Sequence, residues 1–192
     1  MASFGFRCPC GDAASEQLIA TLYSHAVVGL GLGRLYADRP MPWTYWGIVT
    51  LLPMVPDLDV FSVAAYGSPL GHRGITHSLL FAGLLGAATA ALCYRRFRVR
   101  WWSLASLLLA IIASHGLLDA MTWGGETVPF FWPLGGRYGN WGPLPVSDVG
   151  IDLSDLIDSR AIRAELLWLW LPTIAAVSIK LLYDRFAQRR MP

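Results

Sequence analysis

Charged residues are scarce in this chain of 192 residues, and long stretches have almost none. Only 15% of the residues are Asp, Glu, Lys or Arg, whereas 55% are hydrophobic and the mean hydropathy is +0.46. A soluble domain has roughly a quarter of its residues charged, and a disordered chain has few hydrophobic ones. The composition therefore excludes disorder and a soluble domain, and it indicates an integral membrane protein.

Cysteines are also few, with only Cys8, Cys10 and Cys93 in the chain. Three thiols cannot form a disulfide framework, and the first two are too close together for a zinc ribbon. A net charge of +2 gives no reason to expect a nucleic-acid partner. The amino-terminal residues also lack the features of a secretory signal, so we expect residues 1–192 to form a single membrane-embedded domain.

Five apolar segments are candidates for membrane spans. Two of them, 74–94 and 101–121, have 21 residues each, which is enough for a bilayer at about 1.5 Å per residue. The segment 43–55 has 13 residues and reaches only about 20 Å as a helix. We predict an all-α, polytopic helical bundle with about five spans: 17–36, 43–55, 74–94, 101–121 and 164–183.

Basic residues divide unevenly between the two ends of these segments. Alternation of the spans puts ten of the 15 Lys and Arg residues on one side, with only Asp38 and Asp184 of the 13 acidic residues. Because cytoplasmic loops retain Lys and Arg, we expect the loop 95–100 on the inner side of a bacterial inner membrane. The amino terminus is then outside, unless the short segment 43–55 is re-entrant, which would move it inside.

All four histidines and three aspartates fall at the opposite, outer end of this arrangement: His25, His72, His77, His115, Asp57, Asp59 and Asp119. Ionisable groups at membrane depth are costly unless they are paired or bound to a metal. A lone histidine in a membrane helix is more often an interhelical hydrogen bond than a ligand, but that reading does not account for so many at once. Imidazole and carboxylate ligands suit zinc, manganese or iron. We therefore predict a metal centre.

The candidate ligands differ in strength. His115 and Asp119 are four residues apart, so a helix presents both to one ion. His25 and His72 are weaker candidates, and His72 could instead support another ligand. Asp57 and Asp59 follow Pro56 and are expected on a non-helical corner, and Asp59 is either a ligand or a general base. The strongest candidates are Asp57, His77, His115 and Asp119.

Arg73 points to the class of substrate. Two divalent ions with three carboxylates would leave a residual positive charge, which favours an anionic group. Metal centres of this kind activate water and stabilise displacement at phosphorus. The guanidinium of Arg73, next to the start of a predicted helix, is suited to binding a phosphate in a planar fork.

The stretch 122–163 is predicted to be an outer loop with an interfacial helix. Residues 123–146 contain six aromatic residues, six glycines and four prolines, which excludes a helix. This part is either an aromatic belt in the headgroup layer or a cover over the site. Residues 148–158 alternate acidic and apolar side chains, which is typical of an interfacial helix.

Three alternating glycines lie inside the first apolar segment, at Gly29, Gly31 and Gly33. A nucleotide-binding loop would follow a β-strand, and no strand is predicted here. The pattern instead predicts close packing between helices.

These motifs resemble those of the YdjM-type family of bacterial inner-membrane, metal-dependent hydrolases. The resemblance runs from about residue 20 to 150 and implies hydrolase activity without specifying a substrate. The matching elements are Ser24-His25, Pro56-Asp57-Leu58-Asp59, the run His72-Arg73-Gly74-Ile75-Thr76-His77-Ser78, His115-Gly116-Leu117-Leu118-Asp119 with Thr122, Phe131-Trp132-Pro133-Leu134 and Pro145-Val146-Ser147.

A more distant similarity is to the zinc-dependent phospholipase C and P1-type nuclease group, whose members hold three zinc ions. This chain lacks the later His and the second His-x-x-x-Glu/Asp of that group, so one or two metal ions are expected rather than three. By this resemblance the ligands would be His25, Asp57, His72, His115 and Asp119.

We therefore predict a membrane-bound phosphoesterase that acts on a lipid or lipid-linked phosphate at the outer face of the inner membrane, with membrane lipids as its partners. The alternative is a non-catalytic metal-dependent transporter or scaffold. Transport would need a polar path to the inner side, and residues 84–92 and 104–112 contain few polar groups. Intramembrane proteolysis is disfavoured because the chain has no His-Glu-x-x-His motif.

Overall fold

The computed structural model describes residues 22–62, 68–121, 127–139 and 159–189. Within these ranges the chain is helical, and the β pairing there is limited to an isolated antiparallel bridge between Val128 and Tyr138. The predicted all-α class is confirmed for this part of the chain. The predicted start of the first span at residue 17 and the interfacial helix at 148–158 lie outside the described residues.

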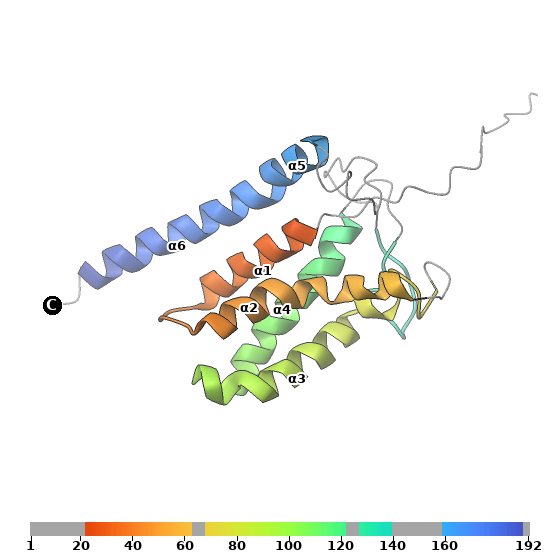
Figure 1. The fold of residues 1–192 in the computed structure, drawn as a ribbon, viewed down its shortest axis with the longest axis horizontal. Helices are drawn as coiled ribbons and strands as arrows, with labels where there is room; N and C mark the ends of the chain where they lie inside the picture. Colours follow the sequence, from red (N-terminus) through yellow and green to blue (C-terminus); the bar gives the residue numbers. More distant parts are fainter. Residues whose placement is uncertain (1–21, 63–67, 122–126, 140–158, 190–192) are drawn as a thin grey trace, which may run out of the picture.

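The helices run back and forth between two ends of a bundle (Figure 1). Helix α1 packs against α2, α4 and α6, and α3 packs against α4. The α-helices are α1 (Leu22–Tyr36), α2 (Trp43–Leu51), α3 (Leu79–Phe97), α4 (Trp101–Ala120), α5 (Ser159–Glu165) and α6 (Leu171–Arg189). The shorter elements are the 3-10 helices η1 (Leu52–Met54), η2 (Pro56–Phe61) and η3 (Ile75–His77), and the π-helix η5 (Leu166–Trp170).

The second apolar segment continues as helix beyond the point where the sequence predicts its end. Pro56 is predicted to start a non-helical corner that carries Asp57 and Asp59, and this prediction is wrong. The corner is the 3-10 helix η2, with Pro56 at its beginning. Proline is tolerated there because the first N–H groups of a helix have no partner within the helix.

The third apolar segment begins with an irregular stretch before its α-helix. The sequence places the span from residue 74, whereas helix α3 begins at Leu79. Ser78 is its N-cap, and the Ser78 hydroxyl accepts a hydrogen bond from the backbone N–H of Phe81 at 3.1 Å. A serine cap satisfies an N–H group at the start of a helix. His77 is thereby left in η3, outside the regular helix.

Among the described residues, two helical stretches are long and apolar enough to cross a membrane, Trp101–Ala120 and Ile162–Ala187. Half of the first is buried inside the protein but only 6% of the second. Helix α4 is therefore central, whereas the stretch containing α6 is peripheral and exposes apolar side chains. The described part of α1 has 15 residues and α2 has 9, and neither of these stretches by itself is long enough for a full crossing.

The alternating glycines of α1 pack closely against other helices, as the sequence predicts. A Cβ atom built on Gly29 would lie 2.3 Å from the carbonyl oxygen of Val49 in α2. One built on Gly31 would lie 2.2 Å from the Thr173 side chain in α6. Neither distance is possible for a real side chain, so both glycines are needed for this packing.

Basic residues from separate segments meet at one end of the bundle. At this end Arg39 of the α1–α2 loop donates a hydrogen bond to the carbonyl oxygen of Arg98, at 2.6 Å, in the α3–α4 loop. Lys180 of α6 pairs there with Asp38, at 3.0 Å between Nζ and Oδ1. We call this the basic end. The predicted metal ligands lie at the other end, near η2, η3 and the end of α4.

Candidate metal centre

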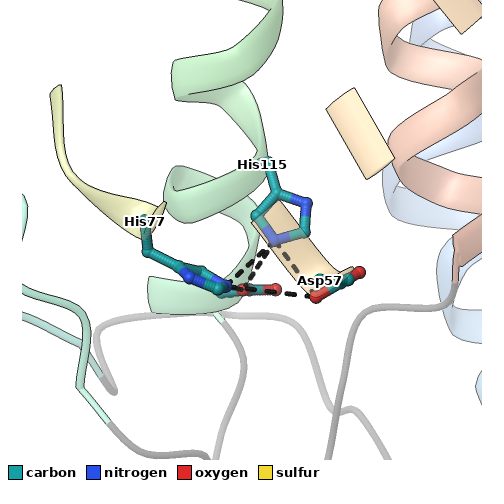
Figure 2. A group of neighbouring side chains, drawn as sticks. Asp57, His77 and His115 are labelled. Atoms are coloured by element: carbon teal, nitrogen blue, oxygen red, sulfur yellow. Dashed lines mark hydrogen bonds and ion pairs between the residues drawn. The ribbon is translucent and has the colours of Figure 1, made fainter. Parts of the chain in front are cut away.

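Four side chains from three elements converge at the end of α4. His115 and Asp119 lie one turn apart on α4, Asp57 comes from η2 and His77 from η3. Figure 2 shows the rings of His77 and His115 and the carboxylate of Asp57 turned toward a common point. One ligand atom from each of the four residues lies within 4.8 Å of the others.

The separations within this set match those around one metal ion. His115 Nε2 lies 3.1 Å from His77 Nε2 and 3.3 Å from both Asp57 Oδ1 and Asp119 Oδ2. His77 Nε2 lies 3.1 Å from Asp119 Oδ2 and 4.0 Å from Asp57 Oδ1. Tetrahedral zinc ligands at about 2.0 to 2.1 Å from the ion are about 3.3 to 3.4 Å from one another. Four of these five separations are close to the tetrahedral value and the fifth, between His77 and Asp57, is longer, so the four residues are close enough to surround one ion.

Burial makes a cation at this point favourable. His77, His115 and Asp119 are buried, and the side chain of Asp57 is the most exposed of the four, at 15%. In a buried site, two carboxylates repel each other, and imidazole nitrogens that face each other lack hydrogen-bond partners. A positive charge between these groups removes both penalties. A divalent cation at this point would compensate both carboxylates.

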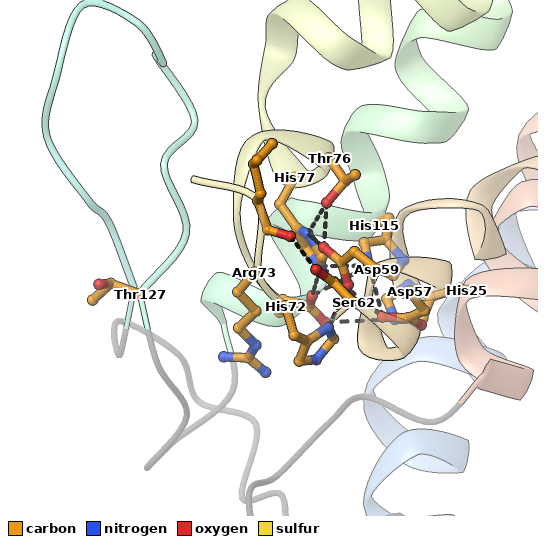
Figure 3. A network of polar contacts seen from close by, with 12 residues as sticks. His25, Asp57, Asp59, Ser62, His72, Arg73, Thr76, His77, His115 and Thr127 are labelled. Atoms are coloured by element: carbon orange, nitrogen blue, oxygen red, sulfur yellow. Dashed lines mark hydrogen bonds and ion pairs between the residues drawn. The ribbon is translucent and has the colours of Figure 1, made fainter. Parts of the chain in front are cut away.

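A second network of polar contacts involves Nδ1, the other ring nitrogen of His77 (Figure 3). Asp59 Oδ2 lies 3.3 Å from His77 Nδ1, and Asp59 Oδ1 lies 2.6 Å from His72 Nδ1. The hydroxyl of Thr76 donates a hydrogen bond to Asp59. A separation of 2.6 Å is too short for two ligands of one tetrahedral zinc ion but is normal for a hydrogen bond to a carboxylate. This separation is that of a hydrogen bond, and Asp59, His72 and His77 also form a second group whose ligand atoms are close enough to hold an ion.

Asp59 is placed to fix the orientation and tautomer of His77. Its carboxylate accepts the proton on Nδ1, so the lone pair of Nε2 faces His115 and Asp119. Hydrogen bonds from His72 and Thr76 and the close contact with His77 favour the charged form of this carboxylate. The group therefore remains an ionised acceptor at neutral pH.

His25 lies beside the four-residue set rather than in it. It is fully buried on α1, and its Nε2 is 3.5 Å from Asp119 Oδ1, the carboxylate oxygen that does not face His77. Its ring is 3.9 Å from the ring of His115, centre to centre. His25 therefore contacts a ligand carboxylate and packs on a ligand ring.

Arg73 is fully buried next to His72, at the edge of the network (Figure 3). Its backbone φ of 56° is in the left-handed region, which is uncommon for a residue with a side chain. The carbonyl oxygen of Arg73 accepts a hydrogen bond from Arg137 Nη2 at 3.2 Å. The loop also needs Gly74, because a Cβ atom there would lie 2.5 Å from the carbonyl oxygen of Pro69. Arg73 is thus held in place by a tightly folded loop.

Two residues of the site have roles that the sequence does not reveal, Thr76 and Gly116. A Cβ atom on Gly116 would lie 3.0 Å from the carbonyl oxygen of His77 and 3.3 Å from the ring of Phe130. Gly116 thus lets η3 approach α4 next to the ligand His115. Both residues lie inside the motifs, but neither has a side chain that binds metals, which is why ligand chemistry did not single them out.

The described part of the aromatic segment, 127–139, packs directly on the site. The carbonyl oxygen of Phe130 accepts a hydrogen bond from the backbone N–H of Leu79 at 2.9 Å, and Arg137 bonds to Arg73. These contacts favour a cover over a simple aromatic belt. The structure thus brings all of the sequence-predicted residues to one end of the bundle, with His25 and Arg73 at the edge of the four-residue set; the role of each stays a prediction.

Comparison with known proteins identifies the family. Residues 20–187 match the family described as YdjM inner membrane protein. Inner membrane protein YbcI of Escherichia coli (strain K12) is 33% identical over 161 residues, which cover 79% of this chain and 91% of that protein. No solved structure gives a significant match. Because the family match extends over most of the chain, including all of the residues of the site, the chain belongs to the YdjM family of inner membrane proteins.

Proposed function

We propose that this protein is a metal-dependent hydrolase of the inner membrane that holds one divalent transition metal ion. The observation that carries the proposal is the convergence of Asp57, His77, His115 and Asp119 with ligand-atom separations of 3.1 to 4.0 Å. Two imidazoles and two carboxylates at this spacing suit zinc best, with manganese or iron as alternatives. Asp59, His72 and His77 form a second candidate group, but the 2.6 Å separation between Asp59 and His72 is that of a hydrogen bond, so we propose one ion.

The bound ion would supply Lewis acidity and lower the pKa of water toward about 7. Asp57, as the most exposed of the four, is on the side from which water and substrate would approach. Asp59 acts as a positioning residue, since it orients His77 and is itself held by His72 and Thr76. We therefore favour this role for Asp59 over that of general base.

We propose a phosphate ester of a lipid or lipid-linked molecule as the substrate. With one ion, the two ligand carboxylates balance the metal charge, so the positive charge for binding an anion must come from elsewhere. Arg73 supplies it from the loop that also carries His72 and His77, and a guanidinium binds phosphate with two parallel hydrogen bonds. The site lies at one end of a bundle of apolar helices, where a lipid headgroup would be presented.

The proposed topology has five membrane-embedded segments with the metal centre on the periplasmic side. The basic end lies opposite the metal centre, and Lys and Arg are retained on the cytoplasmic side. Helix α2 is extended by η1 and η2 to Phe61, which brings the short second segment closer to a full crossing. The aromatic segment then lies on the outer side, where Trp and Tyr suit the headgroup layer.

A structural metal site is the second candidate, because four protein ligands are the number that closes a structural zinc site. Transport has less support. In the half of α4 near the basic end, Leu104, Leu108 and Ile111 are fully buried and apolar, and they leave no polar path through this part of the helix. A structural, non-catalytic role is therefore a stronger alternative to hydrolysis than transport is.

The test is hydrolysis by the purified full chain, supplied with zinc, of a panel of phospholipids and lipid pyrophosphates. We expect release of a phosphate-containing product that stops on chelation and returns when metal is restored. Asp119→Asn should abolish it, whereas Asp184→Asn, the same change at the basic end, should not. Full metal occupancy without hydrolysis of any member of the panel would support the scaffold instead.

A further inference from the structure

A groove between α1 and α6 runs toward the basic end, away from the metal centre. Its apolar part has a volume of about 400 Å³ and is lined by residues of both helices, such as Leu30 and Ile174, and by Trp46 of α2. A polar cleft of about 480 Å³ shares Arg34 and Trp46 with it. The lining residues recur every three or four positions along both helices, so they follow one face of each. The two cavities therefore form one continuous groove.

The acidic residues of the polar cleft are already paired. Asp38 and Asp184 line it, and Lys180 Nζ lies 3.0 Å from Asp38 Oδ1 and 3.1 Å from Asp184 Oδ2. One lysine thus serves both carboxylates and joins α6 to the α1–α2 loop. One lysine balances one of the two carboxylates, so a single negative charge remains beside the three arginines of the cleft.

The three arginines of the cleft keep their positive charge. Arg34 donates a hydrogen bond to the carbonyl oxygen of Ala37 at 2.9 Å, and Arg39 donates to two carbonyl oxygens of the α3–α4 loop. Arg185 lines the cleft from α6 and is exposed. Within the described ranges none of the three forms an ion pair with a carboxylate. The cleft therefore has a net positive charge next to an apolar channel.

We propose that this groove binds one anionic phospholipid, with an acyl chain in the apolar part and the headgroup phosphate at Arg34 and Arg185. Each cavity has a volume within the range of about 300 to 1,000 Å³ of small-molecule sites. Arginines bind phosphate with directed hydrogen bonds, and basic pockets between membrane helices suit anionic headgroups. Trp46, which lines both parts, has the amphipathic side chain that favours the membrane interface.

This lipid site is separate from the metal centre and does not depend on hydrolysis. The groove begins near Val27 on α1, two residues after His25, and extends from there toward the carboxyl-terminal end of that helix, away from the metal ligands. The lipid bound here would be a resident of the groove between α1 and α6 rather than a substrate. Loss of metal should therefore leave lipid binding intact.

The test is native mass spectrometry of the detergent-purified full chain with phosphatidylglycerol or phosphatidylcholine of identical acyl chains. We expect one bound phosphatidylglycerol, preferred by about tenfold or more over phosphatidylcholine. Arg34→Gln combined with Arg185→Gln should remove the preference. Ser178→Trp, at an exposed position that lines the apolar part, should block retention of either lipid while leaving the arginines in place.

The matched control is Arg95→Gln combined with Arg96→Gln, which removes the same charge from the same end but outside the groove. An equal loss of preference in this control would assign the effect to general electrostatics and overturn the site. Equal binding of the two lipids by the wild type would overturn it as well. Displacement of the lipid by inorganic phosphate alone would show a free-anion site and contradict the lipid assignment.

Discussion

The two ends of the bundle handle their charges in opposite ways. At the metal centre, ionisable side chains are buried and face one another, and Asp119 is within 3.3 Å of two imidazole nitrogens. At the basic end the side chains are more exposed, and Arg34 and Arg39 donate hydrogen bonds to backbone carbonyl groups. Charges that are buried and convergent need a common compensating partner. Charges that bond to carbonyls or face water do not.

The metal centre therefore has the properties of a binding site, whereas the basic end has those of a protein surface. Each side chain of the metal centre contacts other side chains of the centre, so a small substitution there should affect metal binding. The basic end should tolerate the same kind of change, since exposed ion pairs contribute little. Matched substitutions at the two ends therefore test whether the contrast is real.

The largest expected contrast is in accessibility from outside the cell. In a background without native cysteines, Leu134→Cys in the aromatic segment should react fully with a membrane-impermeant thiol reagent in intact cells, because Leu134 is 89% exposed. Val99→Cys, in the α3–α4 loop of the basic end, should react only after the membrane is opened. Reversed labelling would place the metal centre on the cytoplasmic side.

Removing the charge of Asp59 should weaken metal binding by about 10- to 100-fold, the usual effect of losing a partner that orients a ligand histidine. Asp59→Asn keeps the shape but can present its N–H₂ group to His77 Nδ1, which favours the wrong tautomer. Zinc titration with a competing chelator measures the change. Asp38→Asn at the basic end is the control and should bind zinc like the wild type; equal affinities in all three proteins would remove Asp59 from the support of the site.

Arg73→Lys keeps the charge but loses the planar fork. Turnover of a phosphate-ester substrate should fall by at least about tenfold, equivalent to roughly 1.4 kcal/mol in the barrier, while metal content stays unchanged. Arg96→Lys at the basic end should have wild-type turnover. If Arg73→Lys retains full turnover but unfolds more easily, Arg73 has a structural role and the reason for preferring phosphate is lost.

The smallest expected effect concerns glycine packing. Gly116→Ala adds a Cβ atom 3.0 Å from the carbonyl oxygen of His77 and should cost about 1 to 3 kcal/mol through overpacking. Gly83→Ala, where no atom lies within 4 Å, should be neutral or slightly stabilising. Thermal unfolding with and without zinc measures both. The Gly116→Ala protein should also gain less stability from zinc, and an equal gain in both would contradict close approach of η3 to the ligands.

Local patterns in the sequence were sufficient to predict part of this fold and site. The apolar run 101–121 predicts helix α4, and the spacing of His115 and Asp119 places both side chains on one face of it. These features depend only on neighbours along the chain. The glycines of α1 likewise predict close packing, because small residues inside a membrane helix let a neighbouring backbone approach closely.

Other features depend on contacts between distant parts of the chain and could not be predicted from local patterns. The sequence predicts that the second segment ends before Pro56, but Pro56 begins η2. The third apolar segment starts at residue 74, but the α-helix begins only after its N-cap, Ser78. The role of Asp59 follows from its contacts with His72 and His77, which lie in a different part of the chain. The sequence offers several possible roles for a carboxylate, and only the folded geometry favours one.

The most direct test of the metal centre is the metal content of the full chain purified without chelator, measured by elemental analysis and divided by the protein concentration. The wild type should contain about one transition metal ion per chain, and His115→Ala combined with Asp119→Ala should contain almost none while Asp184→Asn keeps the wild-type value. A folded wild-type protein that contains no transition metal, and that does not bind zinc when it is added, would contradict the assignment of these residues as a metal centre.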